Sequence, residues 1–192
     1  MLVHARRRPY PRAMAQRAWL ASLVAMLGLL SACTASNSGS ADPIQVFAAA
    51  DRKPAPELTG DLLDGSGAYD PATYAGKILV INFWASWCPP CVAEASELEA
   101  VYADHRDEGV AFLGINVNDQ TDSARAFARQ HTTYPSIEDK SSKLALGFNV
   151  HPRAIPATII LDRQGRVAAV AQGAVWQVDL DPVIVQLLRE SA

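Results

Sequence analysis

Residues 82–98 read "NFWASWCPPCVAEASEL" and hold two of the three cysteines in this chain of 192 residues. The apolar run "KILVINFWA" at residues 77–85 has the length and composition of a strand buried on both faces. From residue 89 to about residue 106, apolar side chains recur at helical spacing, with glutamates on the other faces. Cys88 is therefore predicted to lie where a buried strand passes into a helix.

A cysteine at the start of a helix is favoured as a thiolate. Unpaired backbone N–H groups and the helix dipole stabilise negative charge there, and the thiolate is the reactive species. Pro89 and Pro90 suit the first turn, where a missing N–H costs nothing. We expect Cys88 to be the exposed nucleophile and Cys91, one turn deeper, to be the shielded resolving thiol. The pattern predicts thiol–disulfide exchange.

The cysteine pair has three competing interpretations. A structural disulfide would suit an oxidising compartment, but it would close only a small ring that the helix already orders. Half of a zinc site would need a second cysteine pair or histidines at ligand spacing, and the sequence offers neither. Two inert buried cysteines would not need Trp-Cys-Pro-Pro-Cys around them. Redox chemistry is favoured.

The first 32 residues differ from the rest of the chain. Five arginines without an acid precede an apolar run at residues 19–30, and small residues follow. This pattern is typical of a secretory signal peptide, because a transmembrane helix needs about 20 apolar residues. The residues Leu-Ser-Ala-Cys at 30–33 resemble the bacterial lipobox, which implies a lipid-bearing Cys33. Plain cleavage nearby is the alternative, and the general secretory and twin-arginine export routes both stay open.

The chain divides into three predicted parts. A lipoprotein signal peptide covers residues 1–32, a flexible tether of small polar residues covers 33–50, and a folded domain covers 51–192. Within the domain, an N-terminal hairpin is expected before residue 77. Further elements are strands at 110–117 and 157–162, helices at 121–130, 142–146 and 180–190, and a turn at 163–165 into a strand at 166–173. This order predicts an α/β fold with a mixed central sheet flanked by helices.

The composition limits the classes of partner. A net charge of −3 and a pI near 5.8 give no basic surface for nucleic acid. Three cysteines are too few for a disulfide scaffold. No metal or organic cofactor is expected, since the cysteine pair itself carries the electrons.

The chain resembles the thioredoxin superfamily, specifically its TlpA/ResA-like extracytoplasmic thiol-disulfide oxidoreductases in lipoprotein form. The stretches "NFWASWCPPC" and "AIPATIILDRQGRV" carry this resemblance, which covers roughly residues 55–188. It implies a thioredoxin-like fold with a Cys88–Cys91 disulfide as the redox-active centre. It also implies a cis proline at Pro156 that packs against the disulfide and places the backbone of Ile155 beside Cys88 for an extended substrate. From the sequence alone, an ordinary trans proline is equally acceptable.

The resemblance implies roles for two further side chains. Trp87 is expected to form part of the substrate face, with a core tryptophan as the alternative. Glu94 stands where ResA-like proteins have an acid that assists the thiols, and the alternative is a first-turn glutamate that favours the helix dipole. Asn82 departs from cytoplasmic thioredoxins, whose buried acid at this position handles the proton of the second cysteine. An amide cannot accept that proton, so Glu94 is the candidate.

The function implied is a membrane-anchored reductase of protein disulfides, for example of apocytochrome c in cytochrome c biogenesis, supplied by a membrane electron-transfer protein. A disulfide-forming oxidase of the DsbE/DsbF kind is the alternative, since direction depends on reduction potential. A peroxiredoxin-like peroxidase would have threonine where this chain has Ala85. A Sco-like copper chaperone would have three residues between its cysteines and a histidine ligand, and here the gap is two, although His151 lies near Pro156.

Overall fold

The computed structural model describes residues 43–190, so the predicted signal peptide, Cys33 and most of the predicted tether lie outside the described residues. The described part forms six strands in one sheet together with four α-helices and two short 3-10 turns. The strands are β1 (Ile44–Val46), β2 (Ile78–Trp84), β3 (Val110–Val117), β4 (Ser136–Asp139), β5 (Ala157–Leu161) and β6 (Val167–Gln172). The helices are α2 (Pro89–His105), α3 (Thr121–His131), α4 (Lys143–Gly147) and α5 (Gln177–Arg189), and the 3-10 turns are η1 (Pro71–Tyr74) and η2 (Arg106–Glu108).

The sheet is mixed and has β2 near its centre. Its strand order is β1-β6-β5-β2-β3-β4, and β2 pairs in parallel with β3 and antiparallel with β5. Every residue of β2 and β3 is buried, as expected for apolar strands covered on both faces. The predicted α/β fold class is therefore confirmed.

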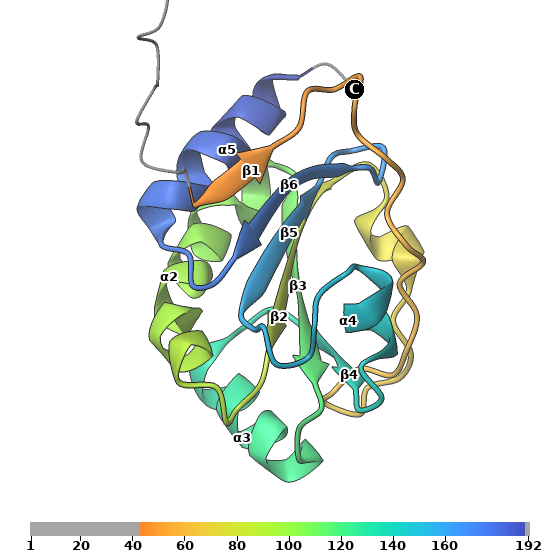
Figure 1. Cartoon of the computed structure of the whole chain (residues 1–192), viewed down its shortest axis with the longest axis vertical. Coiled ribbons are helices and arrows are strands. Elements are labelled where there is room, and N and C mark those ends of the chain that lie inside the picture. The colour runs from red at the N-terminus through yellow and green to blue at the C-terminus, as the bar shows by residue number, and fades with distance from the viewer. Residues whose placement is uncertain (1–42, 191–192) are drawn as a thin grey trace, which may run out of the picture. The chain divides into compact units, whose positions relative to one another are not determined.

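Helices cover both faces of the sheet (Figure 1). On one face, α2 and α5 pack against each other, and Leu98 and Ile184 belong to the core beneath them. On the other face, α4 lies over a core that includes Phe83 and Ile159. The C-terminal end of β2 thus emerges between two packed layers, and Cys88 follows four residues later.

The folded domain begins earlier than residue 51. Ile44–Val46, inside the tether predicted at residues 33–50, form β1, which pairs antiparallel with β6 at the edge of the sheet. Ile44 is buried. A strand of three residues is too short for a periodic pattern to reveal it, and the C-terminal boundary of the predicted tether is corrected to lie before Ile44.

The predicted N-terminal hairpin is reduced to isolated backbone bridges. Asp61 pairs with Ala68 in one antiparallel bridge, and Leu62 forms another with Ile137 of β4. Gly65, in the turn between them, has a φ of 84°, the left-handed region that glycine enters without a steric penalty. The segment therefore turns back on itself and reaches β4, a strand that the sequence pattern does not predict, but forms no regular strands of its own.

None of the helices between residues 43 and 190 has both the length and the apolar character needed to cross a bilayer.

Candidate active site

The turn after β2 brings both cysteines to the start of α2. Cys88 is the N-cap residue of this helix, and Pro89 and Pro90 occupy its first two positions. The structure joins Cys88 to Cys91 in a disulfide, with Cα atoms 5.3 Å apart. The backbone N–H of Cys91 donates to Sγ of Cys88 over 3.3 Å. Sγ of Cys88 therefore caps the helix at the point where negative charge is stabilised.

Both cysteines are buried in this disulfide form. Cys88 is 3% exposed and Cys91 is 2% exposed, so the expectation that only Cys91 would be shielded is wrong for the oxidised protein. The physical reason is packing from other elements, because the two cysteines share an apolar cluster with Ala124 of α3 and the half-buried Ile155.

The loop before β5 lies directly against the disulfide. The Ile155–Pro156 peptide bond is cis, the form that the resemblance implied. The carbonyl oxygen of Ile155 lies 3.6 Å from Sγ of Cys88. This is a contact and not a hydrogen bond, because a disulfide sulfur carries no hydrogen. The backbone of Ile155 is thus positioned where an extended polypeptide can pair beside the sulfur.

Trp87 forms a surface next to the disulfide. Its side chain is half exposed, at 50%, and its indole Nε1 donates to the carbonyl oxygen of Asn118 over 3.1 Å. The alternative of a core tryptophan is therefore wrong. The backbone N–H and the hydroxyl of the preceding residue, Ser86, donate to the carboxylate of Asp119. No pattern near Asp119 in the sequence marks it as a partner of this turn.

Glu94 is a buried carboxyl group in the interior of α2. It is 1% exposed, and it accepts hydrogen bonds from Asn82 Nδ2 over 2.8 Å and from the N–H of Val175 over 2.9 Å. Burial raises its pKa to about 7, although both hydrogen bonds act in the opposite direction. As the sixth residue of a helix that starts at Pro89, it is not a first-turn glutamate, and that alternative is wrong.

Asn82 connects Glu94 to the surroundings of Cys91. Its Nδ2 donates to Glu94 and lies 3.3 Å from Oγ1 of Thr158. Asn82 and Cys91 also line one small internal cavity, together with Tyr134. The small cavity that Cys91 lines thus contains an amide that is itself bonded to a carboxyl group able to titrate near neutral pH.

The described residues offer no obvious metal site. No group of three or more His, Cys, Asp or Glu side chains within residues 43–190 is arranged to hold a metal ion. His151 lies on the loop before Pro156, where its Nδ1 accepts the backbone N–H of Arg153 over 3.1 Å.

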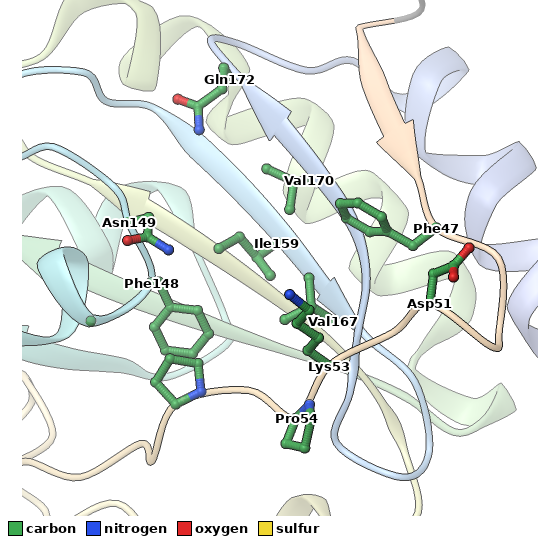
Figure 2. Close-up of a pocket in the computed structure, with 12 residues that line it drawn as sticks. Phe47, Asp51, Lys53, Pro54, Phe148, Asn149, Ile159, Val167, Val170 and Gln172 are labelled. Carbon is green, nitrogen blue, oxygen red and sulfur yellow. The ribbon is translucent and has the colours of Figure 1, made fainter.

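A separate cavity of about 450 Å³ opens on the β5–β6 side of the sheet. Figure 2 shows Phe47 on one side of it and Phe148 on the other, with Ile159 and Val170 between them. Neither cysteine is among its lining residues. The chemistry of the disulfide is therefore carried by the turn after β2 and the loop before β5, not by this cavity.

Comparison with known proteins gives consistent matches. Residues 52–170 match the model of the AhpC/TSA family. The chain is 30% identical over 109 residues to the thiol-disulfide oxidoreductase ResA of Geobacillus kaustophilus, which covers 56% of this chain and 62% of that protein. It is 31% identical over 156 residues to the thiol:disulfide interchange protein DsbE of Pseudomonas aeruginosa, which covers 78% of this chain and 83% of that protein.

The fold is also similar to solved structures. The crystal structure of a DsbF homologue from Corynebacterium diphtheriae superposes with a TM-score of 0.70 and 35% sequence identity, covering 78% of this chain and 96% of that chain. By contrast, the chain spans less than two thirds of the length of the ResA relative, at 62%.

Proposed function

The chain belongs to the AhpC/TSA family, within the thioredoxin superfamily, and on that premise we propose that it is an extracytoplasmic thiol-disulfide oxidoreductase acting on protein substrates. The observation that carries this proposal is the Cys88–Cys91 disulfide at the N-terminus of α2, in contact with the loop that ends in the cis proline Pro156. Cys88 and Cys91 are its catalytic residues, and Trp87 and Ile155 form the surface that receives the substrate.

The proposed direction is reduction, with disulfides of proteins such as apocytochrome c as substrates. The thiolate of reduced Cys88 attacks one substrate sulfur, forms a mixed disulfide, and releases the other substrate sulfur as a thiolate that takes up a proton. The thiolate of Cys91 then attacks Sγ of Cys88, forms the intramolecular disulfide, and releases the second substrate thiolate. The substrate gains two electrons and the cysteine pair loses two. A membrane electron-transfer protein returns the pair to its dithiol form.

Glu94 is the proposed acceptor for the proton of Cys91. It lies one helical turn after Cys91, is bonded to Asn82, and has a pKa of about 7. A carboxyl group with this pKa exchanges protons readily near neutral pH.

The proposal is tested by reduction of insulin disulfides with dithiothreitol as electron donor. The full chain is expected to accelerate the reaction, and Cys88→Ser is expected to return the rate to the uncatalysed background because the attacking sulfur is lost. Reduced Cys91→Ser, which can attack but not resolve, is expected to accumulate a mixed disulfide when it is mixed with insulin after dithiothreitol has been removed, and non-reducing electrophoresis shows this species. A Cys88→Ser variant as fast as the wild type would contradict the proposal.

We also propose that the domain is anchored to the membrane by lipid on Cys33. Two or more acyl chains on one residue give stable anchoring, whereas one chain is marginal. The Cys33→Ser variant is expected to move from the membrane fraction to the soluble fraction after lysis and centrifugation. Cys88→Ser, which leaves the lipidation site intact, should stay with the membrane, and an equal distribution of both variants would refute the anchor.

A further inference from the structure

Asp119 is hydrogen-bonded through its carboxylate to the turn that carries the reactive Cys88. It lies in the connection between β3 and α3, and its carboxylate accepts the N–H of Ser86 over 2.6 Å and the hydroxyl of the same residue over 2.9 Å. It also accepts from Asn116 Nδ2 over 3.0 Å and from the N–H of Gln120 over 2.7 Å. Each carboxylate oxygen therefore receives two donors, which fixes the position of the group.

A second hydrogen bond joins the same turn to the connection between β3 and α3. The indole of Trp87 donates to Asn118, the residue before Asp119. The turn itself is closed by a hydrogen bond of 3.2 Å from the N–H of Cys88 to the carbonyl oxygen of Ala85. Both residues inside this turn are thus bonded to the connection between β3 and α3.

The carboxylate is close enough to Cys88 for its charge to matter. Two residues of chain span at most about 7 Å, so the carboxylate of Asp119, bonded to the N–H of Ser86, lies within about 10 Å of the backbone nitrogen of Cys88. That distance is about one Debye length at an ionic strength of about 0.1 M. Cys88 is buried, and interactions with a buried group are screened less than those between exposed charges.

We propose that Asp119 positions the Ala85–Cys88 turn and, through its fixed negative charge, disfavours the reduced form of the Cys88–Cys91 pair. A nearby anion opposes the build-up of negative charge on Sγ of Cys88, which counteracts the stabilisation given by the helix N-terminus. A less stable reduced form makes the pair a stronger reductant. This inference rests on the proposed function and deepens it, because it identifies a residue that favours the reductive direction.

The test is the equilibrium of the full chain with glutathione. One protein disulfide and two glutathione thiols exchange with two protein thiols and one glutathione disulfide, and the ratio is read by mass spectrometry on the tryptic peptide of residues 78–106, which contains Cys88 and Cys91 but not Cys33. In Asp119→Asn, which keeps the shape and removes the charge, the equilibrium is expected to shift about threefold toward the dithiol. Since tenfold corresponds to about 30 mV, this is a potential about 15 mV more oxidising.

Three further variants separate the effect of the Asp119 charge from the effect of its hydrogen bonds to the turn. Asp119→Glu restores the charge and is expected to return the equilibrium toward the wild-type value. Asp122→Asn removes an exposed carboxylate three residues later and is expected to leave the equilibrium unchanged. Asp119→Ser supplies a second uncharged variant if the amide prevents folding, which circular dichroism will show.

The outcomes distinguish this inference from the proposed function. A wild-type equilibrium in the uncharged Asp119 variants, or an equal shift in Asp122→Asn, would overturn the role of Asp119 while insulin reduction by the wild type still supports the oxidoreductase. A chain that does not reduce insulin would refute the proposed function, and the glutathione equilibrium would still report on Asp119.

Discussion

Glu94 is a carboxyl group whose protonation is coupled to folding. Burial raises its pKa from 4.5 to about 7, so between these two values the native chain binds more protons than the unfolded chain. The free energy of unfolding therefore falls as the pH rises through this range. The shift corresponds to a loss on the order of 3 kcal/mol, since one pKa unit is about 1.4 kcal/mol.

We predict that Glu94→Gln removes this decrease in the free energy of unfolding with rising pH. Glutamine has nearly the same shape and cannot ionise, so the contribution of position 94 to the free energy of unfolding should be constant between pH 4.5 and 7. Urea unfolding of the oxidised protein at several pH values measures the slope. The exposed Glu57 provides the control, because Glu57→Gln should keep the wild-type slope. A Glu94→Gln variant with that same slope would show that the carboxyl group is not held protonated by the fold.

The sequence identifies some residues of this site and not others, for a physical reason. Cys88 and Cys91 are recognisable because two cysteines and two prolines at the start of a helix form one local pattern. The contacts of Glu94 and Asp119 are not local, because Val175 and Ser86 reach them from other elements. Whether Glu94 is buried depends on how α2 packs, which helical spacing alone does not determine.

At the scale of elements, long apolar runs are predictable and short edge strands are not. β2 and β3 are recognisable because every residue in each is buried, and the turn at residues 163–165 correctly predicts the β5–β6 hairpin. β1 and β4 have only three and four residues. Each is defined by the strand beside it, since β1 pairs with β6 and β4 with β3.

The position of β4 in the sheet depends on a glycine in the neighbouring strand β3. Gly114 of β3 pairs with Ser136 of β4, and a Cβ atom at Gly114 would clash with Oγ of Ser136 and lie 2.6 Å from Nε1 of Trp84. Those two side chains are hydrogen-bonded to each other over 3.3 Å. Glycine therefore lets the Trp84 indole cross β3 and reach β4. In the sequence, Gly114 only interrupts an apolar run.

At the scale of the whole described molecule, one arginine joins three distant parts of the chain. The guanidinium of Arg52, near the start of the domain, contacts Asp162 after β5 over 3.3 Å and Glu190 after α5 over 2.7 Å. Its Nε also donates to the carbonyl oxygen of Phe47. The side chains of Arg52 and Asp162 are 1% and 4% exposed, so water has little access to the contact between these two side chains.

We predict that Arg52→Met lowers the free energy of unfolding by about 3 kcal/mol at pH 7, the lower end of the range for breaking a buried ion pair. The lower end applies because Asp162 keeps its bonds to Arg166 and because Glu190, one third exposed, is partly screened. Urea unfolding measures the change. Arg106→Met is the matched control, since that arginine has only an exposed partner and should lose less than about 1 kcal/mol.

Acidification distinguishes a charge effect from a packing effect in this variant. The pKa of Glu190 is lowered, chiefly by its hydrogen bond to Arg52. Burial acts to raise the pKa of Asp162, but hydrogen bonds from Arg166 and Arg52 leave it lowered overall. The ordinary pKa is 4.5 for Glu190 and 3.8 for Asp162. The stability from both carboxylates is therefore present above about pH 4.5 and is lost as the pH falls through their lower folded values. The difference between wild type and Arg52→Met should shrink below about pH 4.5, whereas a difference that stays constant with pH would mean that Arg52 acts through the packing of its hydrocarbon stem.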